Sequence, residues 1–88
     1  MAEAQDGDAF LGGRLRVVQP PGGYRAGADA VMLAAACPAR TGERVLELGC
    51  GAGVALLCLG ARVEGLDLTG LELQPAHAAL ARANAARN

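Results

Sequence analysis

Apolar residues along the chain fall into short runs that predict alternating strands and helices. Two of these runs, 44–48 and 68–73, are brief, apolar and free of proline, as buried strands are. Between them, residues 54–59 continue the apolar pattern after a glycine-rich turn and end near Gly60, which predicts a helix followed by a connection over 61–67. The order strand, helix, strand is typical of a parallel βαβ unit.

Weaker patterns precede this unit. Residues 15–18 predict a short strand, and the run of Gln, two Pro and two Gly at 19–23 predicts a loop. Asp29 is predicted to cap a helix that continues through alanines to Cys37, and Pro38 ends that helix. The first part of the chain therefore contributes one strand and one helix.

The sequence predicts one partial α/β domain over 1–88. Residues 1–9 are polar and expected to be disordered, residues 10–40 hold the short strand and first helix, and residues 41–88 form a βαβα unit. The last helix begins at Pro75, a residue favoured at the first helical position, and alanines sustain it to about residue 86. Parallel strands need neighbours and covered faces, so this small sheet leaves an open apolar edge that predicts self-association.

Composition and charge narrow the protein class. Hydrophobic residues make up 52% of the chain, which is too apolar for a disordered protein. The net charge of −1 argues against a general polyanion-binding surface, although the arginines at 14, 16 and 25 leave RNA binding open. The acidic N-terminus lacks the basic and apolar parts of a signal peptide, and no run reaches the roughly 18 apolar residues of a membrane span. The sequence therefore predicts a cytoplasmic protein.

The cysteines and the lone histidine predict no metal site. Cys37, Cys50 and Cys58 form no C-x-x-C pair, and His77 has no histidine or cysteine beside it. Neither zinc ligation nor a disulfide framework is supported by such spacing. The cysteines are interpreted as small apolar residues in a reducing compartment, and His77 as a surface residue. No residue is predicted to be catalytic.

The strongest chemical signal lies at the glycine-rich turn. Gly49, Gly51 and Gly53 follow the first strand of the βαβ unit, and Glu72 lies in the second strand. A βαβ unit holds the nucleoside end of a cofactor in this way, with the backbone at the turn and a carboxylate on the ribose hydroxyls. These residues predict a cofactor site.

Glycine spacing and a second carboxylate favour S-adenosylmethionine over NAD. The dinucleotide fingerprint needs its third glycine at position 54, which is Val54 here. Glu47, two residues before the first glycine, would repel a pyrophosphate but suits a sulfonium or an ammonium group. An NAD-dependent oxidoreductase fragment stays open as a weaker alternative.

Four segments resemble a known enzyme family. The stretch ELGCGAG at 47–53 resembles the first motif of class I S-adenosylmethionine-dependent methyltransferases, and GLELQP at 70–75 resembles their second. The stretches FLGGRLRVVQP at 10–20 and GYRAGADAVMLA at 23–34 resemble the opening region of the small-domain type. Among these, the chain is most similar to the bacterial enzymes that methylate N6 of an adenine in valine tRNA.

The resemblance implies the N-terminal part of a Rossmann-like methyltransferase fold, an S-adenosylmethionine cofactor and a tRNA substrate. It places the cofactor beside Tyr24, Arg25, Gly27, Asp29, Glu47, Gly49, Cys50, Gly51, Gly53, Glu72 and Leu73.

The resemblance also has a gap. The family holds its target nitrogen with an Asn-Pro-Pro-aromatic motif, and no Asn-Pro pair occurs here. We therefore expect a chain truncated before that motif and inactive by itself, or else a non-catalytic cofactor-binding or interaction remnant.

Overall fold

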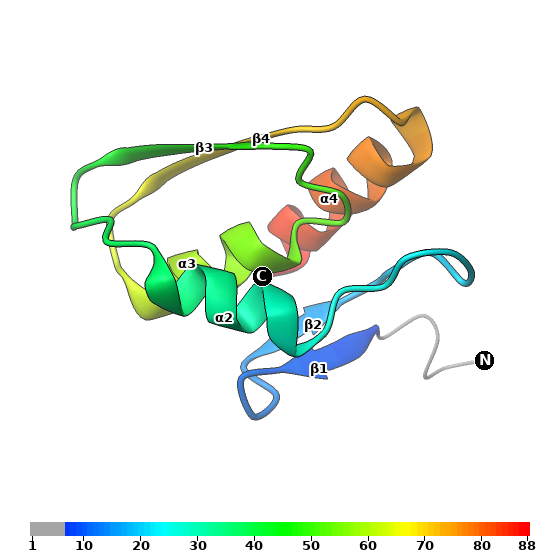
Figure 1. The fold of residues 1–88 in the computed structure, drawn as a ribbon, viewed down its shortest axis with the longest axis horizontal. Coiled ribbons are helices and arrows are strands. Elements are labelled where there is room, and N and C mark those ends of the chain that lie inside the picture. Colours follow the sequence, from blue (N-terminus) through cyan, green and yellow to red (C-terminus); the bar gives the residue numbers. More distant parts are fainter. Residues whose placement is uncertain (1–6) are drawn as a thin grey trace.

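Two small sheets and three helices alternate along the protein in a computed structural model that describes residues 7–88 (Figure 1). The elements are β1 Asp8–Phe10, β2 Leu15–Val17, α2 Ala28–Ala36, β3 Arg44–Leu48, α3 Val54–Arg62, β4 Asp67–Leu71 and α4 Pro75–Arg87. The predicted α/β class is confirmed at this level: short strands alternate with helices, and the final four elements follow the order βαβα.

The βαβα unit contains the parallel strand pair that the sequence predicts. Strands β3 and β4 pair in parallel register from Arg44 opposite Asp67 to Leu48 opposite Leu71. Helix α3 connects them, as parallel neighbours require. Figure 1 shows α2, α3 and α4 on the same side of this sheet. No described element covers its other face.

The predicted end of α3 is wrong, because the helix continues through Gly60 to Arg62. Glycine in a helix interior costs roughly 1 kcal/mol relative to alanine. Here the missing side chain has a packing reason: a Cβ atom on Gly60 would lie 2.9 Å from the Cδ1 atom of Leu68. The glycine lets α3 approach β4 closely, and the helix extends past it.

Strand β4 is shifted relative to its predicted range of 68–73, since it begins at Asp67 and ends at Leu71. The carbonyl oxygen of Leu71 accepts hydrogen bonds from the N–H groups of Gly49 at 2.7 Å and Cys50 at 3.0 Å. These bonds end the strand pairing where the glycine turn begins. Glu72, predicted inside the strand, therefore lies just beyond it.

The beginning of the described chain forms an antiparallel hairpin. Strand β1 pairs with β2 from Asp8 opposite Val17 to Phe10 opposite Leu15. The expectation of disorder over 1–9 is wrong for Asp8 and Ala9, which belong to β1. For residues 1–6, that expectation lies outside the described residues.

The predicted cap of α2 is wrong, because the helix begins at Ala28 and Asp29 lies inside it. Gly27 occupies the N-cap position, and Asp29 lies in the first turn. The Oδ1 atom of Asp29 accepts a hydrogen bond from the backbone N–H of Gly27 at 2.8 Å. This backward bond satisfies a free amide at the helix start, as the acidic partner of a capping box does. The helix ends at Ala36, before Pro38 as predicted.

The core lies between the hairpin, α2 and α3. Its buried side chains are mostly small, which suits close packing of the two helices. They are Leu15, Val17, Ala30, Ala34, Ala52, Val54, Cys58 and Leu59. None of the described helices is long and apolar enough to cross a membrane.

Helix α4 is joined to the hairpin by asparagine side chains. Asn84 is completely buried, and its amide bonds both the N–H and the C=O of Val18. One turn later, the amide of Asn88 pairs in the same way with Arg16. Alanine-rich α4 has little apolar surface to bury, so these bonds are its main specific link to the hairpin.

The uncovered face of the β3–β4 sheet carries three exposed leucines. Leu46, Leu48 and Leu71 expose 56%, 74% and 53% of their surface. At the edge of β3 that faces α2 and α3, a hollow of about 400 Å³ is lined almost wholly by apolar residues, among them Leu33 and Leu59. Contiguous exposed apolar surface of this kind marks an interaction site or an aggregation hazard.

We expect the double variant Leu46→Thr/Leu48→Thr to self-associate less than the wild-type chain. Threonine retains strand propensity while removing apolar surface. Because both leucines are exposed, the free energy of unfolding should change by less than about 0.5 kcal/mol per site. Sedimentation velocity over a range of concentrations measures the association. Met32→Gln, at an exposed site on α2, is the control; equal association of all three proteins would contradict the prediction.

Candidate functional site

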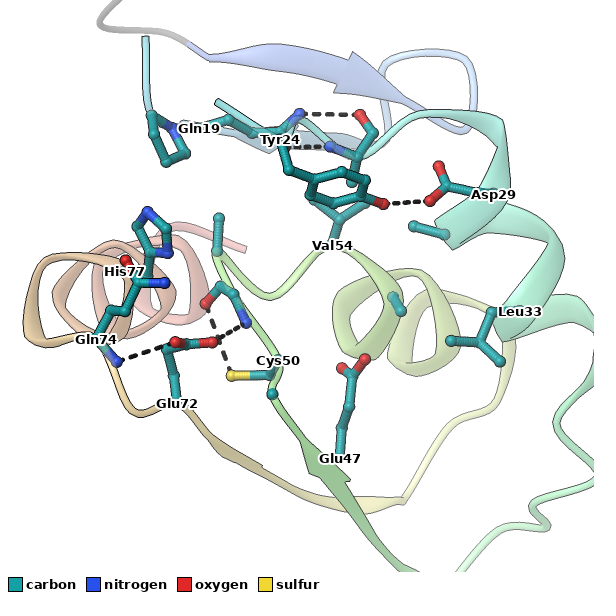
Figure 2. A pocket seen from close by; sticks show the side chains of 17 residues that line it. Gln19, Tyr24, Asp29, Leu33, Glu47, Cys50, Val54, Glu72, Gln74 and His77 are labelled. Carbon is teal, nitrogen blue, oxygen red and sulfur yellow. Dashed lines mark hydrogen bonds between the residues drawn. The ribbon is translucent and has the colours of Figure 1, made fainter. Parts of the chain in front are cut away.

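A cavity of about 320 Å³ opens where β3 and β4 end. Its walls come from the glycine turn, the first turns of α2 and α4, and the loop that follows β2 (Figure 2). Ligands of parallel α/β sheets bind outside the carboxyl ends of the strands, which is where this cavity lies.

The predicted site residues divide into two groups. Those in the cavity wall are Tyr24, Asp29, Glu47, Gly49, Cys50, Gly51 and Glu72. Those outside the wall are Arg25, Gly27, Gly53 and Leu73.

The glycine turn presents bare backbone to the cavity. Gly49 and Gly51 have φ angles of 73° and 58°, in the left-handed region that favours glycine. A Cβ atom at either position would meet no atom within 4 Å. The space beside the turn is therefore open, and a ligand can approach its backbone directly.

Glu47 projects into the cavity from β3, with its carboxylate directed away from the strand (Figure 2). Its Oε1 atom is buried and has no hydrogen-bond partner. Burial raises the pKa of this carboxyl above its ordinary value, because the charged form loses hydration. An acceptor in this state gains most from a donor or a cation placed in the cavity.

Glu72 lies across the glycine turn from Glu47 and is held by backbone donors. Its Oε2 atom accepts from the N–H of Gln74 at 3.0 Å, and its Oε1 atom accepts from the N–H of Gly51 at 2.8 Å. These bonds, that of Gln74 first, lower the pKa of the carboxyl. Each oxygen retains a lone pair, so an ionised Glu72 can still accept two hydroxyl groups.

The loop after β2 adds a tyrosine–aspartate pair. The hydroxyl of Tyr24 donates a hydrogen bond to Asp29 (Figure 2). This bond lowers the pKa of Asp29, to which the Gly27 N–H also donates, and it raises the pKa of Tyr24. The pair therefore offers the cavity an ionised carboxylate beside an aromatic ring.

The residues outside the wall have other contacts. Arg25 forms an ion pair with Asp8 and donates to the carbonyl of Pro20. Gly53 caps α3 and borders a second hollow, between α3 and α4. Leu73 exposes 94% of its surface to solvent. The predicted contacts of these residues with a cofactor stay predictions.

Cys50 lies inside the glycine turn and lines the cavity. Burial raises the pKa of its thiol, and the carboxylates of Glu47 and Glu72 raise it further. The thiol is therefore held in its protonated, weakly nucleophilic form.

Sequence reasoning missed three polar residues in the wall: Gln19, Gln74 and His77. The placement of His77 as a plain surface residue needs correction, because it is half-buried and lines the cavity from the first turn of α4. Its position two residues after Pro75 was a usable signal. Gln19 lies within the stretch at 10–20 that resembles the family, but no residue near it in the sequence indicated that its side chain would line the cavity.

Replacing Glu47 by glutamine should stabilise the unliganded chain at neutral pH. A charged, partnerless acceptor that is half-buried costs folding free energy, and we expect a gain of about 1 kcal/mol in the free energy of unfolding. The pKa of Glu47 is raised in the folded chain above its ordinary value of 4.5. The free energy of unfolding of the wild type therefore falls as the pH rises from 4.5 through the pKa of the folded chain. The difference between variant and wild type should therefore vanish below about pH 4.

Urea unfolding at several pH values measures this difference. Glu64→Gln, which changes an exposed carboxylate outside the cavity, is the control and should alter stability little. A Glu47→Gln variant that is less stable than wild type at neutral pH would show that the carboxylate has a stabilising partner.

The sequence is similar to curated methyltransferases. No family model matches the sequence. Over 61 residues, or 68% of the chain, it is 38% identical to a tRNA1(Val) (adenine(37)-N6)-methyltransferase of Yersinia pestis (strain Pestoides F), of which the match covers 25%. Its similarity to the protein of that name from Yersinia pseudotuberculosis (serotype O:3, strain YPIII) has the same identity and length and covers 24% of that protein.

The chain thus spans about a quarter of the length of the curated relatives that it matches. The resemblance predicted from the motifs is confirmed: over two thirds of its length, this chain is similar to bacterial tRNA1(Val) adenine-N6 methyltransferases.

Proposed function

We propose that the chain binds S-adenosylmethionine and forms the cofactor-binding half of a methyltransferase that acts on N6 of an adenine in tRNA. The proposal depends above all on one observation: the buried, partnerless Oε1 atom of Glu47 in a cavity whose opposite side holds the ionised carboxylate of Glu72. Two acidic groups on either side of an open glycine turn suit a ligand that is cationic at one end and carries ribose hydroxyls at the other.

The residues of the cavity fit S-adenosylmethionine. Glu72 would accept the two ribose hydroxyls through the lone pairs that its backbone bonds leave free. Glu47 would meet the positively charged methionine portion and satisfy its orphaned oxygen. Gly49 and Gly51 would allow the cofactor to lie against the turn, since no side chain fills that space.

The chemistry assigned to the protein is positioning. When bound, S-adenosylmethionine supplies a methyl group that its sulfonium charge has already activated. Glu47 and Asp29 would orient that charged end, and the turn would fix the nucleoside end, so that the methyl group is presented in one direction. No residue of this chain is assigned to hold the acceptor nitrogen.

The tRNA substrate is inferred from the relatives, which are tRNA1(Val) (adenine(37)-N6)-methyltransferases. The part of those proteins that this chain does not match would supply acceptor recognition. The apolar face of β3 and β4 would then pack against further polypeptide. The alternative is a remnant that binds the cofactor or a partner without catalysis.

The NAD alternative is less well supported. A dinucleotide places its pyrophosphate at the glycine turn, and the carboxylate of Glu47 would lie next to it in the cavity. Burial of that carboxylate strengthens the repulsion, because screening by water is reduced.

Calorimetric titration with S-adenosylhomocysteine tests the proposal. We expect binding to the folded chain, no binding of NAD, and an affinity at least about tenfold lower for Glu72→Ala, because charge-assisted hydrogen bonds are lost. Glu64→Ala is the matched control and should bind as wild type does. A chain that is folded by circular dichroism but binds neither ligand would overturn the proposal, and preferential binding of NAD would favour the oxidoreductase alternative.

A methyl-transfer assay separates the enzyme from the remnant. With labelled S-adenosylmethionine and tRNA, we expect no transfer by this chain alone. Transfer to adenine N6 is expected when a polypeptide carrying the Asn-Pro-Pro-aromatic segment of a relative is added. Cofactor binding without transfer in that mixture would support the remnant.

A further inference from the structure

Asn84 is the one buried polar side chain among residues 7–88, with 0% of its surface exposed. Its Oδ1 atom accepts from the N–H of Val18 at 2.9 Å. Its amide nitrogen donates to the carbonyl oxygens of Val18 and Ala52, each at 2.9 Å. Both N–H groups and the carbonyl oxygen are therefore used, a combination that neither a carboxylate nor a hydrocarbon side chain can reproduce.

The partners of Asn84 lead to two different walls of the cavity. Ala52 belongs to the glycine turn and lines the cavity itself. Val18 directly precedes Gln19 and Pro20, which line the cavity from the loop after β2. A single side chain from α4 therefore fixes the glycine turn relative to that loop.

A second amide extends this connection along the loop. The Nε2 atom of Gln19 donates to the carbonyl of Ala26 at 3.1 Å, and the N–H of Ala26 donates to Oε1 of Gln19 at 2.8 Å. This pairing closes the loop over 20–25, which carries Tyr24, and leads into the first turn of α2 with Asp29. The tyrosine–aspartate pair is thus held to the glycine turn through Gln19, Val18 and Asn84.

We propose that Asn84 is a positioning residue for the cofactor site, which sets the spacing between the glycine turn and the Tyr24–Asp29 side of the cavity. The inference rests on the proposed function, because it is this spacing that would let one ligand contact both sides. Asn84 does not line the cavity and would not contact the ligand. It acts through Ala52 and Val18.

Asn88 provides a matched control on the same face of α4. Its Oδ1 atom accepts from the N–H of Arg16 at 3.1 Å, and its Nδ2 atom donates to the carbonyl of Arg16 at 2.9 Å. It therefore joins α4 to β2, whereas Asn84 joins α4 to Val18, the residue that follows β2. Its remaining bond goes to the carbonyl of Asn84, not to the glycine turn.

Asn84→Ala and Asn88→Ala should both lower the free energy of unfolding, but they should differ in ligand binding. We expect the dissociation constant for S-adenosylhomocysteine to rise about tenfold or more for Asn84→Ala and to change less than about twofold for Asn88→Ala, at temperatures where each variant is folded. If Asn84→Ala does not fold, the pair Asn84→Asp and Asn88→Asp replaces it, since aspartate retains the acceptor for the Val18 N–H but cannot donate to the carbonyl oxygens of Val18 and Ala52. Equal shifts for the two sites, or wild-type affinity for the Asn84 variant, would overturn the inference.

Amide hydrogen exchange of the unliganded chain tests the positioning role without any ligand. The Asn84 variant should exchange faster than wild type in both 18–26 and 49–53, whereas the Asn88 variant should change only around 15–17. Faster exchange in just one of the two cavity segments would overturn the inference. Failure of the wild-type chain to bind S-adenosylhomocysteine would instead overturn the proposed function, and the exchange result would still stand.

Discussion

The carbonyl oxygen of Leu71 is the point on which the site depends. It accepts from two successive amides, those of Gly49 and Cys50, at the place where the β3–β4 pairing ends. Because both amides bond to one oxygen, the chain leaves β3 in a sharp turn. Glu72 therefore lies beside that turn instead of continuing the strand. Glu47 and Glu72 then lie at the same edge of the sheet, with the glycine backbone between them.

Local signals predicted much of the fold, whereas contacts between distant segments set the remainder. Strand β3 and the start of α4 at Pro75 agree with the sequence prediction, because strand propensity and proline at a helix start act within a few residues. The length of α3 could not be predicted in this way, since only the folded chain shows that a Cβ atom at position 60 would meet the side chain of Leu68. Strand β1 is three residues long and contains Asp8, so only its pairing with β2 defines it.

The candidate site shows the same division. The carboxylates and glycines follow strands at recognisable spacings, and the sequence could indicate them. Gln19 and Asn84 carry no such signal, because the function of a primary amide depends on which backbone groups the fold brings to it. The sequence therefore predicted the carboxylates and glycines that would face a ligand, but not the amide side chains that hold them in place.

The side chains that join α4 to β2 and to the residue after it are neutral amides, whereas the cavity is lined by three carboxylates, those of Asp29, Glu47 and Glu72. Amides do not titrate, and dissolved salt screens them little. Changes in acidity or ionic strength can therefore alter the charge of the cavity while the attachment of α4 to the hairpin is unaffected. The charged cavity thus responds to pH and salt, whereas the amide contacts that hold the fold together do not.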